Sequence, residues 1–165
     1  MKRWYVVHTQ AQGESRALFN LGRQGFEAWL PRVRRQRRHA RRVDTVLRPL
    51  FPRYLFVRVD LETEPWRPIL STFGVSHVIG GDEGPSPVPD AVIDALASRA
   101  GPDGHFELGA ESFQSGDKVR ILEGPLAEFE GIFQAASDDE RVMILLRLMG
   151  REVRVTVRGN DIEAV

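Results

Sequence analysis

The stretch "RPLFPRYLFVRVDL", residues 48–61, decides the fold. Pro49 and Pro52 cannot donate a ladder hydrogen bond, so the strand begins after them. From there the side chains alternate between the two faces of a strand. One face is aliphatic, and we expect it in the core: Leu55, Val57 and Val59. The other combines aromatic residues with charges: Tyr54, Phe56, Arg58 and Asp60. We expect this second face to be only partly covered, or covered by something removable.

The segments on either side of this strand alternate between strand and helix patterns. Residues 3–9 are rich in aromatic and β-branched side chains and predict a strand, and residues 14–24 predict a helix. Downstream we expect a short helix near residues 65–72, a strand over 75–79 and a helix that begins at Pro89. The buried side chains of the two longer helices are Ala17, Leu18, Leu21, Val92, Ile93 and Leu96. The pattern predicts an α/β sandwich-type domain over residues 1–98.

A hairpin arm is expected before the central strand. Residues 26–31 begin a strand, the run "RVRRQRRHARR" at residues 32–42 interrupts it, and residues 42–47 return. The run holds seven arginines in eleven residues. Such runs are usually solvated, but the planar guanidinium also suits phosphate oxygens. We expect the run to form the tip of the arm and to contact DNA phosphates without sequence preference through Arg35, Arg37 and Arg38.

The last third of the chain has a different pattern. Residues 99–112 are rich in glycine and predict a flexible linker. Residues 113–165 contain short alternating runs at 117–122, 130–136, 141–148 and 152–157, which predict a small β-barrel. The acidic cluster of Asp138, Asp139 and Glu140 reads as a solvated hairpin turn, because no further spaced acids complete a cation-coordinating loop.

Composition limits the class of protein. The chain has 165 residues, no cysteine and a formal net charge of zero. Residues 1–100 carry 16 basic and 10 acidic side chains, whereas residues 101–165 carry 7 and 13. This asymmetry suggests different partners for the two halves, or attraction between them. No signal peptide or membrane-spanning run is evident, so we expect a soluble, cytoplasmic monomer that does not bind membranes.

The sequence offers little for catalysis. The four histidines are scattered, and no phosphate-binding, dinucleotide-binding or serine-nucleophile motif is present. We therefore expect no enzyme, no metal site and no cofactor. The binding features are stronger. Along the first helix, Arg16, Asn20, Arg23 and Gln24 form a polar, basic stripe at helical spacing. Together with Thr72, this stripe can meet phosphates and exposed base edges, or it is an ordinary solvent face.

Two segments carry a family resemblance. "PLFPRYLFVRVD" resembles the strand signature of the NusG N-terminal (NGN) domain, and "SGDKVRILEGPLAEFEGIF" resembles the KOW motif. The segments "WYVVHT" and "GVSHVI" also match in order, so the resemblance covers nearly the whole chain. It is nearest to the specialised RfaH branch of the NusG family, and it implies an NGN domain, a linker and a five-stranded KOW barrel.

The resemblance implies a non-enzymatic elongation and antitermination factor that suppresses pausing and termination. Its NGN domain would bind the coiled coil of the clamp in the largest RNA polymerase subunit. The residues that match the family's polymerase patch are Phe51, Tyr54, Phe56, Ile93 and Leu96. The helix stripe, with Gln10 and Thr72, matches the contact with non-template DNA, and upstream DNA would also be touched. Gln10, Asn20 and Phe73 depart from the basic residues of the RfaH branch.

The resemblance leaves the C-terminal segment with two alternatives. In the RfaH branch it first folds as an α-helical hairpin that masks the polymerase patch. Against this, Pro125 would lie inside the first helix at a cost of about 3 kcal/mol, and residues 152–157 are β-patterned. Arg48 stands where that branch has an acid pairing with the arginine that matches Arg141. We therefore predict the barrel rather than the hairpin.

Two alternatives to the main function remain. KOW barrels also occur in ribosomal proteins, so a ribosome- or RNA-binding module acting in translation is one. The net acidic charge of residues 101–165 speaks against it. A nucleic-acid enzyme is the other, and the missing catalytic motifs disfavour it. Leu126, Phe129 and Ile132 would contact a small ribosomal subunit protein or fill the barrel core.

Overall fold

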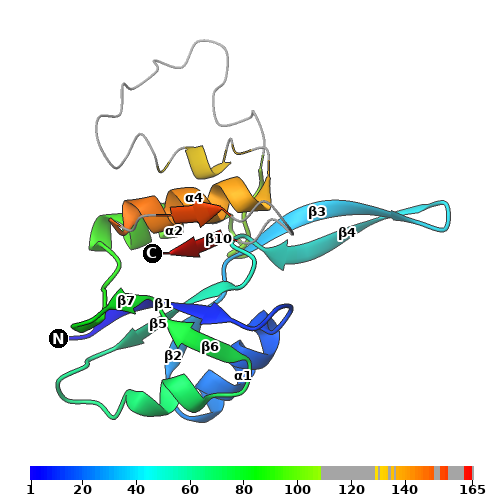
Figure 1. The fold of residues 1–165 in the computed structure, drawn as a ribbon. Helices are drawn as coiled ribbons and strands as arrows, with labels where there is room; N and C mark the ends of the chain where they lie inside the picture. Colours follow the sequence, from blue (N-terminus) through cyan, green and yellow to red (C-terminus); the bar gives the residue numbers. More distant parts are fainter. Residues whose placement is uncertain are drawn as a thin grey trace.

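A four-stranded antiparallel sheet forms the centre of the molecule (Figure 1). The structure is a computed structural model that describes residues 1–108, 129, 131–133, 135, 137–150, 153–155 and 162–164. The sheet has the order β2-β5-β1-β6. Its strands are β1 (Arg3–Thr9), β2 (Glu27–Trp29), β5 (Tyr54–Val59) and β6 (Val75–Val78). In this register Val6 lies opposite Phe56 and Val7 opposite Leu55. The predicted strands over residues 3–9 and 75–79 are confirmed.

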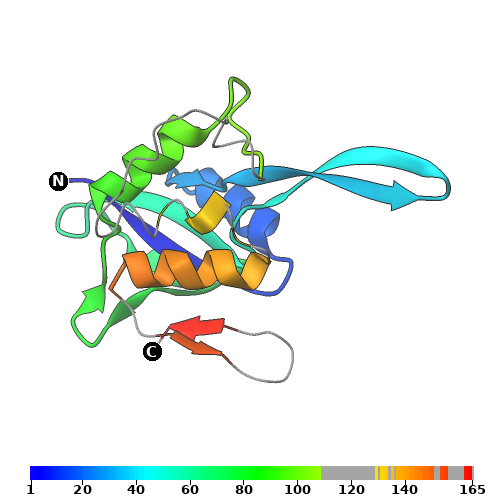
Figure 2. The ribbon, with the colours of Figure 1, turned by 90° about the horizontal axis from the view of Figure 1, so that it is seen from above.

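The two faces of the sheet pack against different helices. Helix α1 (Glu14–Arg23) and the 3-10 helix η1 (Arg67–Ser71) lie on one face, and α2 (Asp90–Arg99) and α4 (Asp138–Leu148) lie on the other (Figures 1 and 2). The first face buries the aliphatic residues of β5 in one cluster: Leu55, Val57 and Val59. The second face buries Tyr54 and Phe56 in a separate cluster. The alternation predicted for the central strand is therefore confirmed.

Strands β3 (Arg32–His39) and β4 (Arg42–Pro49) pair to form a two-stranded arm that extends away from the rest of the molecule (Figure 1). The hairpin arm is confirmed, but the arginine run is not confined to its tip. Most of the run forms β3 itself, and only Ala40 and Arg41 make the turn, both with positive φ. A turn with two positive φ values matches the twist of the flanking strands, so the ribbon continues to its end.

The segment after α2 is held against the arm. Phe106 is fully buried, its backbone N–H donates to Arg32 O at 2.9 Å, and its carbonyl accepts from the Arg34 N–H at 3.0 Å. Within the predicted linker, Arg99 is the last residue of α2 and Phe106 is bonded to β3, while residues 109–112 lie outside the described residues. A second short hairpin, β7 (Gly80–Gly81) with β8 (Gly84–Pro85), precedes α2.

The prediction of a strand over residues 141–148 is wrong, because these residues belong to helix α4. Ser137 caps the helix, with its hydroxyl accepting from the Glu140 N–H at 3.2 Å. The predicted acidic hairpin turn, Asp138 to Glu140, is the first turn of this helix, where acids stabilise the positive end of the helix dipole. Leucine, methionine and arginine are good helix formers, and Val142, Leu145 and Leu146 fall on one buried side.

No five-stranded barrel is present in the described part of the C-terminal segment. Residues 131–133, predicted within a strand, are helical. The strand expected over 152–157 is present as β9 (Val153–Val155), which pairs antiparallel with β10 (Ile162–Ala164). The strand expected over 117–122 lies outside the described residues. The barrel prediction fails at residues 131–133 and 141–148 because burial against the sheet outweighs their alternating pattern.

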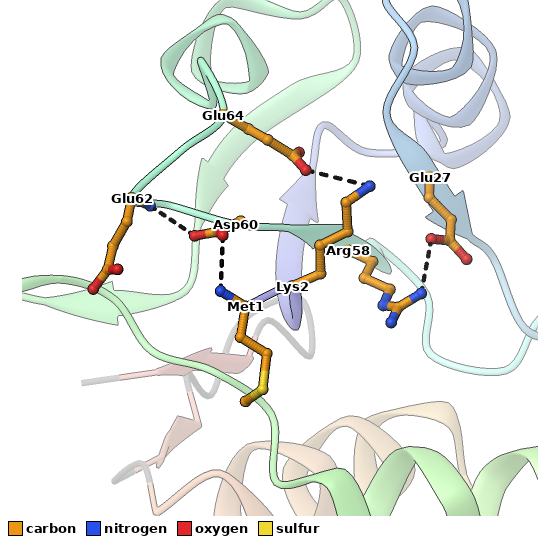
Figure 3. A network of polar contacts seen from close by, with 7 residues as sticks. All are labelled: Met1, Lys2, Glu27, Arg58, Asp60, Glu62 and Glu64. Carbon is orange, nitrogen blue, oxygen red and sulfur yellow. Dashed lines mark hydrogen bonds and ion pairs between the residues drawn. The ribbon is translucent and has the colours of Figure 1, made fainter.

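Charged groups join the N-terminus to the residues that follow β5 (Figure 3). The Met1 amino group donates to Asp60 Oδ2 at 2.8 Å, and Lys2 Nζ lies 3.2 Å from Glu64 Oε1. The Glu62 N–H also donates to Asp60. These contacts join the residues before β1 to the residues after β5. None of the helices in the described ranges combines the length and apolar character needed to cross a membrane.

Candidate aromatic patch and nucleic-acid interface

The five residues predicted to form the polymerase patch lie together in one buried cluster. Phe51, Phe56 and Leu96 have at most 1% of their surface exposed, and Tyr54 and Ile93 have 4% and 8%. β5 supplies Tyr54 and Phe56, whose side chains share a face because they are two residues apart. Phe51 meets Phe56 edge to face, with ring centroids 6.1 Å apart. We refer to these five residues as the aromatic patch.

The cover of this patch comes from the C-terminal segment. Val142, Leu145 and Leu146 of α4 belong to the same cluster, and Leu145 and Leu146 are completely buried. The cluster also contains Phe129, Ile132 and Phe133. Phe129 and Ile132, which were predicted for a KOW contact or the barrel core, therefore pack toward the sheet. Leu126 lies outside the described residues. The aromatic patch is thus shielded by residues more than 30 positions away in the sequence.

Arg141 is the least expected member of this contact. Its side chain is completely buried, and its Nε–H donates to Leu50 O at 2.9 Å. Its Nη2 pairs with Asp138, whose Oδ1 also lies 2.9 Å from Arg35 Nη2 on β3. Burial, and secondarily the nearby charge of Arg35, lowers the pKa of Arg141 to about 10. The guanidinium therefore stays charged at neutral pH, although its Nη1 has no hydrogen-bond partner among the described residues.

This arrangement changes the expected role of Arg48. The family resemblance implied that Arg48 would face Arg141, and two positive charges there would have repelled α4. In the structure Arg48 is exposed, and Asp138 supplies the negative charge from within α4. The sequence analysis assigned Asp138 to a hairpin turn. It therefore missed that Asp138 and Arg141, three residues apart, lie side by side on a helix.

The polar stripe on α1 is brought together with the end of η1. Asn20 Nδ2 donates to Arg16 O at 2.8 Å, and Gln24 Nε2 donates to Thr72 Oγ1 at 2.8 Å. Thr72 is buried and its hydroxyl donates to Pro68 O at 2.9 Å, so it positions Gln24 instead of facing solvent. Arg23 is exposed on the same helix. Gln10 is exposed as well, and its N–H donates to Gly74 O at 2.8 Å beside this surface.

Phe73 belongs to this surface, although the residues predicted to bind DNA did not include it. It is 68% exposed, and the guanidinium carbon of Arg16 lies 5.2 Å from its ring centroid. Phe19, 65% exposed, projects from the outer side of α1. Aromatic rings beside arginines suit the stacking of unpaired bases. The sequence signal that could have identified Phe73 is an aromatic residue directly after Thr72, which was itself predicted to bind DNA.

The arm forms a second basic surface, on the α4 side of the molecule (Figure 1). Its base is neutralised, since Arg34 pairs with Asp103 and Glu107, and Arg35 with Asp138. Arg37 lies 3.8 Å from Asp44 across the arm. The predicted DNA contacts on the arm and on α1 therefore form two separate surfaces. Within the described residues, no group of three acidic or histidine side chains could hold a metal ion.

The chain is similar to known proteins of one family. The family model described as "Transcription termination factor nusG" matches residues 2–97. The chain is 27% identical to the "Transcription termination/antitermination protein NusG" of Pseudomonas aeruginosa, over 99% of both chains. It is 29% identical to the protein of that name from Thermus thermophilus, over 92% of both. A solved structure, "Domain interaction in Thermotoga maritima NusG", matches at 24% identity with a TM-score of 0.38, over 56% of this chain and 54% of that one.

Proposed function

Because this chain belongs to the NusG family, whose members are non-enzymatic transcription termination and antitermination factors, we propose that it acts as a self-masked factor of the RfaH type. In the closed state, α4 covers the surface that binds RNA polymerase. In the open state, the aromatic patch binds the coiled coil of the polymerase clamp. The observation that carries this proposal is the burial of all five patch residues in one cluster with Val142, Leu145 and Leu146 of α4.

The chemistry of the patch supports a protein partner. Clustered aromatic residues are the usual anchors of protein interfaces, and truncating one typically costs about 2 kcal/mol of binding. Two charged side chains of α4 contact the rest of the molecule: Asp138 pairs with Arg35, and Arg141 donates to Leu50 O. Such a contact is easier to open than a purely apolar one, because water stabilises these charges once α4 leaves.

The open state would also free the C-terminal segment. We propose three units: an NGN domain at residues 1–98, a connection over 99–112 and a KOW domain at 113–165 that takes its barrel form when released. Phe129 and Ile132, now packed on the sheet, would then be available to the barrel core or to a small ribosomal subunit protein. The β-pairing of β9 with β10 supports this, since part of the segment is already extended.

Nucleic acid would be contacted at both basic surfaces. The α1 surface would meet non-template DNA through Gln10, Arg16, Asn20, Arg23 and Gln24, with Thr72 holding Gln24 in place. The arm would contact the phosphates of upstream DNA through Arg35, Arg37 and Arg38. Because Arg35 also pairs with Asp138, a phosphate at Arg35 would compete directly with the closed state.

Binding of the full-length protein to core RNA polymerase tests the proposal. Leu145→Glu places a charge in the buried face of α4, so it should open the protein and tighten polymerase binding at least about tenfold. Arg147→Glu, at an exposed position on the same helix, is the matched control and should leave binding unchanged. Adding Tyr54→Ala and Phe56→Ala to Leu145→Glu should remove the gain. Equal binding by Leu145→Glu and the unsubstituted protein would contradict the masking.

A further inference from the structure

We propose that the arm inserts one face into the major groove of B-form duplex DNA and contacts base edges there. This inference rests on the proposed DNA contact of the arm and deepens it, from phosphates alone to groove and bases. The major groove of B-form DNA, about 12 Å wide, admits a two-stranded β-ribbon. The arm is such a ribbon: its eight residue pairs run without interruption from Arg32–Pro49 to His39–Arg42.

The free part of the arm is long enough to enter the groove. Its base is anchored, since Val33 is fully buried and Arg35 pairs with Asp138. Every residue from Gln36 to Thr45 is exposed, and the arm stands clear of the body in both views (Figures 1 and 2). Four strand steps from Gln36 to the turn extend about 14 Å, and the groove is only about 8.5 Å deep.

The two faces of the arm differ in a way that indicates which one reads bases. On one face, Gln36 lies opposite Thr45 and Arg38 lies opposite Val43, and Leu47 follows on the same face toward the base of the arm. We call these five residues the reading face. The other face contains the only acid of the arm, Asp44, which pairs with Arg37 at 3.8 Å. On that face Arg35 and Arg37 are already paired with Asp138 and Asp44, whereas Arg38 on the reading face has no acidic partner among the described residues, so the reading face is the one that turns toward the bases.

The reading face has the side chains that recognise bases in the major groove. Glutamine can bond adenine in a bidentate way, arginine can bond guanine, and apolar side chains contact the thymine methyl group. Val43 is 57% exposed and Leu47 is 40% exposed. In the free protein a large part of each of these apolar side chains therefore faces water. A groove lined with methyl groups gives them an apolar partner.

The charge of the arm matches duplex DNA. Residues 32–49 contain eight arginines and one aspartate, for a formal charge of +7. The three arginines near the tip, Arg38, Arg41 and Arg42, have no acidic partner among the described residues. They line a hollow of about 370 Å³ together with His39 and Val43. Side chains at this end can bind phosphates on both sides of the groove. The deep, narrow major groove of A-form RNA excludes such a ribbon, so the partner is duplex DNA.

The test uses the full-length chain and three 24-base-pair probes of mixed sequence. The first is ordinary duplex DNA. The second is the same duplex with glucosylated 5-hydroxymethylcytosine, which fills the major groove with sugar and keeps every phosphate. The third is duplex RNA. We expect binding to the glucosylated and RNA probes to be at least about tenfold weaker, since base contacts are lost. Gln36→Ala with Thr45→Ala should reduce this difference, whereas Val46→Ala on the other face should not.

Equal binding to the ordinary and glucosylated duplexes would overturn groove insertion. The triple variant Arg38→Ala/Arg41→Ala/Arg42→Ala then separates the remaining outcomes. If it weakens binding and lowers the salt slope by about 0.9 for each lost phosphate contact, the arm binds phosphates only and the proposed function stands. If it binds as the unsubstituted protein does, the DNA contact of the arm is wrong as well.

Discussion

At the scale of single residues, the contact between Asp60 and the Met1 amino group shifts the pKa of both groups. Hydrogen bonds from the Met1 amino group, and further ones from Thr63 and the Glu62 N–H, lower the pKa of Asp60 from 3.8 to about 2. The same contact raises the pKa of the Met1 amino group above 8.0. Both charged forms are therefore favoured by folding (Figure 3).

The pH dependence of stability follows from these two directions. The contribution of Asp60 is present above about pH 4 and is lost as the pH falls through about 2, because its folded-state pKa is lowered. The contribution of the amino group is present below pH 8.0 and is lost as the pH rises through its raised pKa. Asp60→Asn should therefore lower the Tm most between pH 4 and pH 8, as measured by thermal unfolding. Glu83→Gln, an exposed residue of the same charge, should show no such window. A Tm difference for Asp60→Asn that does not change with pH would contradict the assignment.

At the scale of elements, local patterns predicted the first hundred residues well and the C-terminal segment poorly. The alternation of Tyr54 to Val59 predicted both faces of β5, because a period of two is fixed by strand geometry. Residues 141–148 are apolar at spacings that suit either structure. Ser137 and the following acids favoured a helix locally, but burial against the aromatic patch decided it, and that patch is distant in sequence.

The turn that follows η1 depends on a glycine. Gly74 has a φ of +92°, and a Cβ there would lie 2.7 Å from Ala17 N and 2.9 Å from Gly13 O. Gly74→Ala should therefore destabilise the protein by about 1–3 kcal/mol, since both the backbone conformation and the close approach to α1 are strained. Chemical denaturation measures this. Gly22→Ala in α1 is the contrasting control, because open space surrounds it and alanine favours helix, so it should stabilise by up to about 1 kcal/mol. Equal effects of the two substitutions would show that the close approach does not matter.

At the scale of the whole molecule, sequence predicted which surfaces exist but not how they are joined. The alternation within β5 predicted the aromatic face of Tyr54 and Phe56, and helical spacing predicted the basic stripe, whereas Phe51, Ile93 and Leu96 were assigned to the patch from the family resemblance. The link from β3 through Asp138 to Arg141 was not predicted, since it joins residues about 100 positions apart. Arg141 was expected to face Arg48, and only the packing of α4 against Leu50 shows its actual partners.

The two residues of this link should have opposite effects on opening. Asp138→Asn leaves a buried arginine without its counter-charge and should weaken docking of α4 by about 1–3 kcal/mol, raising polymerase affinity. Arg141→Met replaces a buried charge with an apolar side chain of similar length and should hold α4 as firmly or more firmly. Titration of both full-length variants with core RNA polymerase measures this. Arg141→Met binding more tightly than Asp138→Asn would refute the assigned roles.

The burial of the aromatic patch also bears on solubility. A chain that opened without polymerase nearby would present Phe51, Tyr54 and Phe56 to water, and contiguous apolar surfaces of this kind promote self-association. In the proposed open state, binding to a partner protein and self-association would compete for the same exposed surface. The packing of α4 would then limit self-association as well as partner binding.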